Sequence, residues 1–409
     1  MRSAVVLGAG MVGVSTALHL QRRGFSVTLV DRRGAGEETS FGNAGIIQSE
    51  AVEPYPMPRD VVSLARVAIG VANDVRYRIS ALPGHIGPLA RYWWNSEPHR
   101  HAEFTKAYAS LIVRAVEEHA VFIAAAGADD LIGHDGYFMV HRKDRQFEDG
   151  IAKAKHAHEL YGVPYRVITP EDIRALEPSV TGALVGGIHW TGAVPVSDPG
   201  RLVKLYAALF EREGGTIAVG DAASLKPAGS GWSVEASAGR VEAEIAVVAL
   251  GPWAPEFLEP YGYHFSLVRK RGYHRHFAGG ATLSRPLFDM AYGFVIAPMA
   301  RGLRITTGAE FTGRDSGATP VQLVRAEKAA RELLDLGTSV DPDPWFGTRP
   351  FLASMLPVIG EAPRHKGLWF HFGHGHQGFT LGPASGRLFA ELVTGEAPSV
   401  DPTPFLPKS

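Results

Sequence analysis

Residues 4–13 read AVVLGAGMVG, a short apolar run that leads directly into three glycines at Gly8, Gly10 and Gly13. In a strand–turn–helix unit the first glycine allows a tight turn and the second lets the backbone approach a pyrophosphate. The third lets the helix pack closely on the strand. The N–H groups at the start of such a helix face the phosphate oxygens. This predicted cradle consists of Gly8, Ala9, Gly10, Met11, Val12 and Gly13.

A second apolar run, residues 26–30, ends at Asp31 and is followed by Arg32. An acid at this point, about 20 residues beyond the glycine turn, is placed to accept hydrogen bonds from a ribose. Strand, helix, second strand and terminal acid therefore agree on a dinucleotide site at the start of the fold. A plain strand–helix turn with idle glycines is the alternative that this agreement disfavours.

Composition excludes several classes of protein and of site. The 41 basic residues nearly balance the 42 acidic ones, so a nucleic-acid partner is not expected. The chain has no cysteine, which rules out disulfides, thiolate catalysis, thiolate metal sites and a cysteinyl-linked flavin. No apolar run is long enough to span a bilayer. We expect a cytoplasmic protein, with peripheral membrane contact through the mildly amphipathic stretch 61–75 as the open alternative.

A glycine-rich turn near the carboxyl end forms the second informative feature. Residues 368–372 read as a strand, residues 373–383 (GHGHQGFTLGP) as the turn, and a helix is expected to start near Pro383. Small residues there let a flat ring lie against the backbone, and a helix N-terminus stabilises the negative charge of a reduced flavin. A nicotinamide has less use for this arrangement. The predicted flavin contacts are Gly375, His376, Gly378, Phe379 and Thr380.

Two further loops have the composition of cofactor-binding segments. Residues 38–45 (ETSFGNAG) combine small and hydroxyl-bearing side chains that suit a loop around a pyrophosphate, although an ordinary turn stays open. Residues 250–253 (LGPW) follow a buried strand, and a glycine there favours close approach to a ligand. The candidates in these loops are Thr39, Ser40, Asn43, Ala44, Gly45, Ile46, Gly251 and Trp253. His374 and His376 lack a neighbouring carboxylate pattern, so no metal site is expected. We expect both side chains to form hydrogen bonds with solvent or substrate.

These segments, together with Arg349-Pro350 and residues 356–360 (LPVIG), occur in an order that resembles the FAD-dependent D-amino acid dehydrogenases. That family lies within the D-amino acid oxidase, glycine oxidase and sarcosine oxidase group. The resemblance covers nearly the whole chain and is weakest over residues 50–190. It implies an α/β (α+β) fold in which a Rossmann-like FAD-binding domain, residues 1–48, 194–258 and 345–409, is interleaved with a substrate-binding domain. The latter, residues 49–193 and 259–344, is expected on a mixed, largely antiparallel sheet.

By this resemblance Arg349 binds the substrate carboxylate, and a planar guanidinium suits that role because it forms two parallel hydrogen bonds. A structural arginine is the alternative. The resemblance also puts Tyr273 and His274 near the substrate, with His376 from the closing turn. Tyr273 is expected to close over the carboxylate, and His274 or His276 to meet a polar substrate group, unless these are ordinary strand positions. Relatives carry Pro-Asp where this chain has Ala353-Ser354, which leaves the substrate open.

The implied enzyme oxidises the CH–NH bond of a D-amino acid to an imine by hydride transfer to N5 of a non-covalently bound FAD. A cyclic substrate such as D-proline or hydroxy-D-proline is preferred on the resemblance of residues 349–360 to proline-type relatives. The alternatives are a glycine or sarcosine oxidase, a flavoprotein subunit that passes electrons to a partner, and an NAD-dependent dehydrogenase. Oxygen, a quinone or a partner protein stays open as the electron acceptor.

Overall fold

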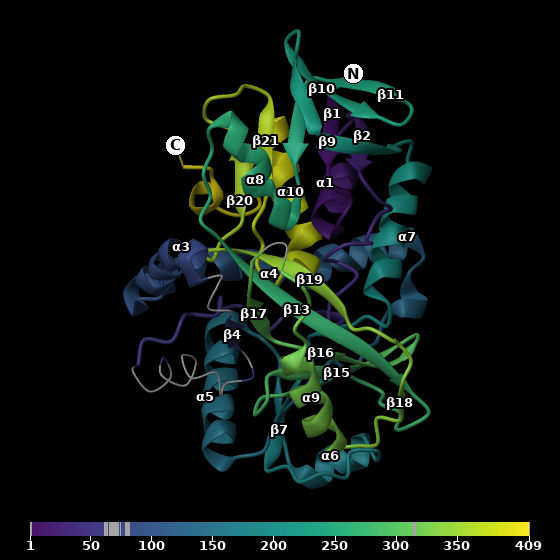
Figure 1. Cartoon of the computed structure of the whole chain (residues 1–409), viewed down its shortest axis with the longest axis vertical. Coiled ribbons are helices and arrows are strands. Elements are labelled where there is room, and N and C mark those ends of the chain that lie inside the picture. The colour runs from purple at the N-terminus through teal and green to yellow at the C-terminus, as the bar shows by residue number, and fades with distance from the viewer. Residues whose placement is uncertain are drawn as a thin grey trace.

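The computed structural model describes residues 2–60, 64, 73, 75–77, 82–313 and 316–408. Most of the predicted amphipathic stretch 61–75 lies outside the described residues. The molecule is elongated, and its two large sheets lie one beyond the other along the long axis, with both termini at the upper end in Figure 1. None of the helices in the described ranges has the length and hydropathy needed to cross a membrane.

The upper sheet is built around the glycine fingerprint. In spatial order it contains β11 (Gly239–Ala243), β10 (Gly231–Ala236), β9 (Thr216–Ala228), β2 (Ser26–Asp31), β1 (Ser3–Leu7), β12 (Ile245–Val248), β21 (Leu368–Phe372) and β20 (Val358–Glu361). The five strands from β9 to β21 run parallel, and the strands at both ends pair antiparallel. The strands expected from the sequence at residues 26–30, at residues 368–372 and directly before residues 250–253 are therefore confirmed.

Both faces of the upper sheet are covered, because side chains alternate along its buried central strands. Ala4 and Val6 of β1 pack with α1 (Met11–Gln21), α7 (Pro199–Arg212) and α10 (Gly378–Thr394). Val5 and Leu7 face the other way, toward α8 (Ala254–Leu258). The long helix α4 (Pro98–Ala126) packs against α10 and α7.

Helix α10 begins at Gly378, earlier than the start expected near Pro383. Pro383 lies inside the helix, where a proline has no N–H to give to the carbonyl four residues before it. That carbonyl, on Phe379, instead accepts a hydrogen bond at 2.9 Å from Nε2 of His119 on α4. A tertiary hydrogen bond thus replaces the missing helical one. The helix can therefore extend on the N-terminal side of Pro383 as far as Gly378.

The lower sheet is mixed and mostly antiparallel. Along its main path it contains β4 (Val75–Tyr77), β17 (Ala309–Phe311), β13 (Leu267–Ala278), β16 (Gly302–Thr306), β15 (Phe294–Met299), β14 (Leu287–Asp289), β5 (Tyr137–His141), β7 (Gly186–Trp190) and β6 (Arg166–Ile168). β18 (Thr338–Ser339) and β19 (Trp345–Leu352) also pair with β13, which crosses the middle of the molecule in Figure 1. A short ladder joins β3 (Ile46–Ile47) to β8 (Val194–Pro195).

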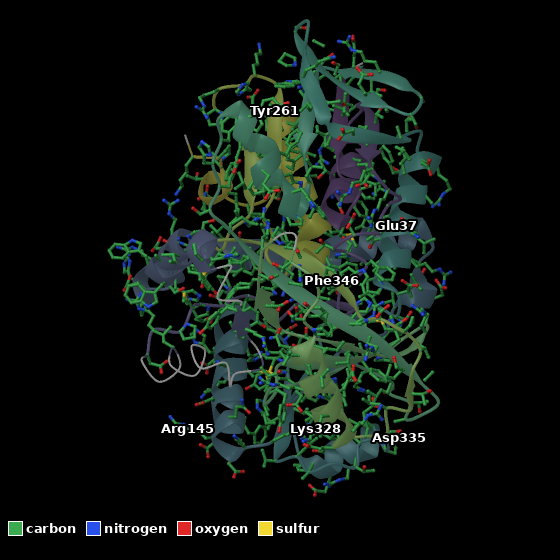
Figure 2. The ribbon with its side chains drawn as sticks, in the orientation of Figure 1. Glu37, Arg145, Tyr261, Lys328, Asp335 and Phe346 are labelled. Carbon is green, nitrogen blue, oxygen red and sulfur yellow. The ribbon has the colours of Figure 1, made fainter. Side chains whose placement is uncertain are left out.

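Helices surround the lower sheet, namely α3 (Leu82–Asn95), α5 (Asp144–Tyr161), α6 (Pro170–Leu176) and α9 (Val321–Arg331). Exposed charged side chains such as Arg145 on α5 and Lys328 on α9 project from this part of the molecule (Figure 2). The predicted α/β fold class with a mixed second sheet is confirmed. The domain limits remain a proposal, and the pairing of β19 with β13 groups residues 345–352 with the second sheet.

Candidate functional site

One cavity of about 1120 Å³ joins the two sheets. It starts at the carboxyl ends of β1 and β2, where a doubly wound sheet binds its ligand, and reaches β13 and β19. The predicted residues that line it are Gly8, Gly10, Met11, Val12, Asp31, Arg32, Thr39, Ser40, Asn43, Ala44, Ile46, Gly251, Trp253, Arg349, Gly375, His376, Gly378 and Phe379. Ala9, Gly13, Gly45, Thr380, Tyr273 and His274 do not line it.

The glycine turn requires its glycines for geometric reasons. Gly8 has a φ of +105°, and a Cβ there would lie 2.6 Å from the carbonyl oxygen of Ala249. A Cβ on Gly13 would lie 1.8 Å from the oxygen of Gly8. Gly13 is therefore needed for helix packing and Gly8 for the turn, while Gly10 lines the cavity itself. The resulting concave backbone at the N-terminus of α1 is one that any side chain would fill.

Asp31 is fixed by two backbone N–H groups before any ligand binds. The N–H of Ala9 donates to Oδ2 at 2.7 Å, and that of Arg33 donates to Oδ1 at 2.8 Å. Each carboxylate oxygen has a second lone pair, and Asp31 lines the cavity. Next to it, the Arg32 guanidinium lies 4.6 Å above the ring of Trp253. The acid expected for a ribose and the residues expected around it are thus brought together.

The loop of residues 38–45 is held in place by tertiary hydrogen bonds. Ser40 Oγ accepts from the N–H of Met11 at 3.0 Å, which ties the loop to the start of α1. Nη1 of Arg304, a buried residue on β16, donates to the carbonyls of Phe41 at 3.1 Å and Asn43 at 2.8 Å. The sequence analysis missed Arg304. Its only signal was a charged residue among the apolar side chains of residues 303–306.

His276 supports the same loop rather than a ligand. Its Nδ1 lies 2.7 Å from Oδ2 of Asp341, and its Nε2 accepts a hydrogen bond from Nε of Arg304 at 2.9 Å. The chain Asp341–His276–Arg304 therefore reaches from β13 to the carbonyls of the loop. His276 does not line the cavity.

The closing turn brings a row of buried imidazoles to the cavity wall. Nε2 of His374 lies 3.0 Å from Oγ of Ser385, which also lies 2.9 Å from Nε2 of His371. Burial lowers the pKa of His374 to about 3, and burial holds the pKa of His376 well below its ordinary value. Both rings are therefore neutral at pH 7. Contrary to the hydrogen bonding to solvent or substrate expected for it, His374 is bonded inside the protein because α10 packs against the turn.

The N-terminus of α10 follows this turn and faces the cavity at Gly378 and Phe379. The first N–H groups of a helix have no partner within it and carry partial positive charge. Among the described stretches of the chain, no group of three or more histidine and acidic side chains is arranged to hold a metal ion. The turn therefore offers a neutral, positively polarised wall.

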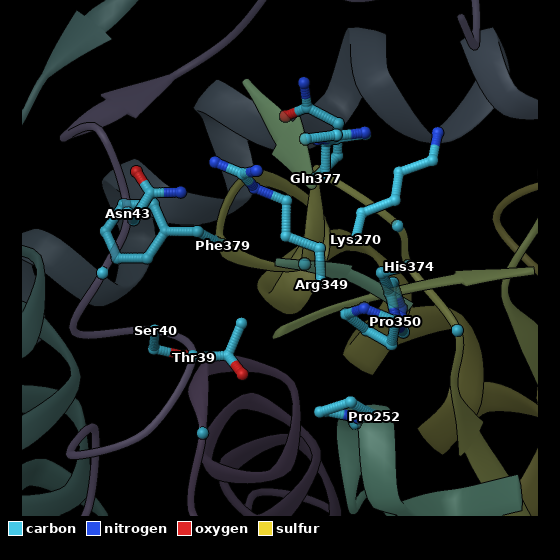
Figure 3. Close-up of a pocket in the computed structure, with 18 of the residues that line it drawn as sticks. Thr39, Ser40, Asn43, Pro252, Lys270, Arg349, Pro350, His374, Gln377 and Phe379 are labelled. Carbon is cyan, nitrogen blue, oxygen red and sulfur yellow. The ribbon is translucent and has the colours of Figure 1, made fainter. Parts of the chain in front are cut away.

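At the other end of the cavity, Arg349 of β19 and Lys270 of β13 project from neighbouring strands (Figure 3). The Arg349 guanidinium donates to the carbonyls of Gly308 at 2.8 Å and Thr307 at 3.0 Å. Burial lowers its pKa to about 10, so it stays charged at pH 7. A Cβ on Gly272 would lie 2.6 Å from the Arg349 guanidinium nitrogens, so a glycine there makes room for this side chain.

Tyr273 and His274 are not brought into this group. The hydroxyl of Tyr273 donates to Oε2 of Glu310 at 2.6 Å, and the ring of His274 stacks on Trp345 with centroids 4.7 Å apart. The register puts Lys270 opposite Arg349, so Tyr273 lies about 10 Å farther along β13 at the usual rise per residue.

A polar network that the sequence analysis missed completes the wall. Nε2 of Gln377 donates to Oε1 of Gln48 at 2.6 Å, and Nε2 of Gln48 donates to Glu50 at 2.5 Å. The hydroxyl of Tyr137 donates to the same Glu50 oxygen at 2.8 Å. Burial raises the pKa of Glu50. Three members of this network line the cavity, namely Gln48, Tyr137 and Gln377. No local motif predicts them, because they come from three distant segments of the chain.

Comparisons with known proteins agree with this geometry. The DAO family model, described as FAD dependent oxidoreductase, matches residues 3–392. A D-amino acid dehydrogenase of Methylobacterium radiotolerans is 30% identical over an alignment that covers 97% of this chain and 96% of that protein. A D-amino-acid oxidase of Bradyrhizobium diazoefficiens is 27% identical, with 99% and 98% covered. The structure of glycine oxidase from Geobacillus kaustophilus is similar in fold, with a TM-score of 0.75 at 19% identity and 99% and 98% covered.

Proposed function

The chain belongs to the DAO family of FAD-dependent oxidoreductases, and from that premise we propose that it oxidises the CH–NH or CH–NH₂ bond of a D-amino acid. The observation that carries this proposal is the single cavity that connects the glycine cradle to Arg349. A cofactor held at one end and a carboxylate held at the other meet in the same space. Relatives named D-amino acid dehydrogenase and D-amino-acid oxidase support the substrate class.

The residues present fit FAD. The cradle of Gly8, Gly10 and Gly13 leaves backbone room for a pyrophosphate, and Asp31 presents an oriented carboxylate for a ribose. The N-terminus of α10 supplies positive polarisation for the flavin ring. When bound, FAD supplies the acceptor for the hydride that leaves the substrate carbon. We propose that it is held without a covalent bond, because the chain has no cysteine.

Arg349 would hold and orient the substrate. A guanidinium has five N–H donors. Nη1 and Nη2 of Arg349 each donate one hydrogen bond, to the carbonyls of Gly308 and Thr307. These bonds fix its plane, while the remaining donors can bind a carboxylate. Alignment of this kind contributes about 7–11 kcal/mol in well-oriented reactions. Neutral His374 and His376 add no competing charge near the carboxylate at pH 7.

D-proline or hydroxy-D-proline as substrate is supported only by the likeness of residues 349–360 to proline-type relatives. A glycine or sarcosine oxidase remains the alternative within the family, and the fold likeness to glycine oxidase favours retaining it in any test. A flavoprotein subunit that passes electrons to a partner is the remaining alternative.

An anaerobic titration tests the proposal. FAD-replete protein is mixed with D-amino acids, their L forms, glycine, sarcosine and hydroxyproline isomers, and the flavin absorbance is followed. We expect bleaching by D-amino acids and none by the L forms. Bleaching by glycine or sarcosine alone would favour the alternative amine oxidase. A flavoprotein that no amine bleaches would refute the proposed activity and favour the electron-transfer subunit.

A further inference from the structure

Lys270 is the buried charge that the proposed reaction leaves without a role. It lies directly opposite Arg349 in the antiparallel pair of β13 and β19, and both residues line the cavity. Directly opposed residues have Cβ atoms about 4.5–5.5 Å apart, and like charges in such a pair are destabilising. Two cations therefore share one wall of the cavity at an energetic cost to the empty protein.

No carboxylate among the described residues neutralises this pair. Neither Lys270 nor Arg349 forms an ion pair in the described ranges. Among the described residues, the acidic ones that line the cavity are Asp31, Glu38, Asp221 and Glu256. Asp31 and Glu38 belong to the nucleotide end, Asp221 lies on β9, and Glu256 pairs with Arg269. The positive charge on this wall is therefore available to a bound anion.

The surroundings of Lys270 are aromatic. Its side chain is 5% exposed, and Nζ lies 3.5 Å from the ring centroid of Phe351, 4.9 Å from that of Tyr92 and 5.9 Å from that of Phe311. Aromatic faces attract a cation but do not neutralise it. A methionine at this position would pack on the same rings with no charge to desolvate. The ammonium group therefore contributes nothing to packing that a neutral side chain lacks.

The two cationic groups point to different parts of the cavity. The Arg349 guanidinium is held toward the carbonyls of Thr307 and Gly308, whereas Lys270 extends toward Phe351 and Tyr92. Figure 3 shows the two side chains diverging from adjacent backbone positions. A single small carboxylate bound to the guanidinium would leave the ammonium without a partner.

We propose that Lys270 forms a second anion subsite, so that the cavity accepts D-amino acids whose side chain carries a carboxylate. The proposal rests on the function proposed above, in which Arg349 takes the α-carboxylate. The aromatic rings around Lys270 then pack on the methylene groups between the two carboxylates. Arg349 gains an anionic partner from any D-amino acid, whereas the buried Lys270 gains one only when the substrate side chain is acidic.

Binding of such a substrate is coupled to proton uptake. Burial, with a smaller contribution from Arg349, lowers the pKa of Lys270 to about 7. Among the described residues, Tyr92 on α3 and His376 in the closing turn also lie against it, and neither carries a negative charge at pH 7. A second carboxylate beside Nζ favours the ammonium form, so an acidic substrate draws protons from solution above pH 7.

The test compares D-glutamate and D-aspartate with the neutral D-glutamine, D-norvaline and D-proline, using the FAD-replete enzyme and its Lys270→Met variant. We expect the wild type to prefer the acidic substrates over all the neutral ones, including the cyclic D-proline that the resemblance favours. The Lys270→Met variant should lose at least about 30-fold in kcat/KM for the acidic substrates, with less than about 3-fold change for the others. Arg269→Met is the matched control, because it removes the neighbouring positive charge, which pairs with Glu256 instead of facing the aromatic rings. It should keep the acidic preference.

Three results would overturn the subsite. A wild type without acidic preference excludes it directly. Equal losses for acidic and neutral substrates in Lys270→Met would mean that both cations hold one carboxylate. The third result comes from measuring kcat/KM against pH. If the decrease of kcat/KM at low pH disappears in Lys270→Met for every substrate, Lys270 would be the group that accepts the proton of the substrate α-ammonium. Bleaching by no D-amino acid at all would instead refute the proposed function.

Discussion

The two ends of the cavity are built in different ways. The nucleotide end uses backbone: glycines without side chains, N–H groups at two helix starts, and one oriented acid. The substrate end uses side chains of β13 and β19 that meet through strand pairing. Backbone geometry follows from residues close in sequence, whereas side-chain pairing depends on register. Motifs therefore identify the first end, and contacts must identify the second.

The largest effect should come from breaking the nucleotide end. Gly10→Val puts a branched side chain into the cradle, where a Cβ lies 3.4 Å from Ser40 Oγ, and blocks approach of the pyrophosphate. We expect FAD affinity to fall by about 100-fold or more, measured by fluorescence of the released flavin. Gly87→Val is the control, since a Cβ at Gly87 meets no atom within 4 Å. Equal FAD binding in both variants would contradict the cradle.

Arg349→Lys should break the substrate end and leave the nucleotide end intact. Lysine keeps the charge but loses the parallel hydrogen bonds and the contacts with two carbonyls. We expect kcat/KM for D-amino acids to fall by about 100-fold while the flavin stays bound. Steady-state kinetics and the visible spectrum report the two ends separately. Arg301→Lys, at an exposed position, is the control. An unchanged KM would exclude the carboxylate role.

Tyr273→Phe tests whether Tyr273 belongs to the substrate end of the cavity or only supports the surrounding structure. The variant removes the hydrogen bond to the buried Glu310, so we expect a loss of about 1–3 kcal/mol in the free energy of unfolding. KM should not change, because Tyr273 does not line the cavity. Urea unfolding measures the free energy of unfolding, and steady-state kinetics measure KM. A raised KM with unchanged stability would mean that Tyr273 contacts the substrate, as the resemblance implied.

The smallest effect concerns pH and the closing turn. The pKa of His374 is lowered by burial to about 3 in the folded protein, whereas an unfolded histidine titrates near 6.5. Between these values the unfolded state binds the proton and the folded state does not, so stability falls as the pH drops below about 6.5. His374→Gln should reduce the loss of stability between pH 7 and pH 5 by up to about 2 kcal/mol. An identical loss of stability in the wild type and the variant would mean that other titratable groups dominate the pH dependence.

Much of the predicted nucleotide site comes from residues close together in the sequence, and its cofactor role stays a prediction. Gly8, Gly10, Asp31 and Ser40 line one cavity because they lie within one strand–helix–strand unit and its exit loop. The sequence did not predict Arg304, the start of α10 at Gly378, or the network of Gln48, Glu50 and Tyr137. Each of these depends on a hydrogen bond between segments far apart in the chain.

The sequence by itself determined the tight glycine turn near the start of this chain and the glycine-rich turn near its carboxyl end, since both follow from local backbone conformation. Only the tertiary structure decided which polar residues of β13 are already engaged. Tyr273, His274 and His276 are engaged with Glu310, Trp345 and Asp341, while Lys270 faces Arg349. All four lie within five positions of the chain. The register of β13 against its neighbours separates them, because it alone determines which partner each side chain meets.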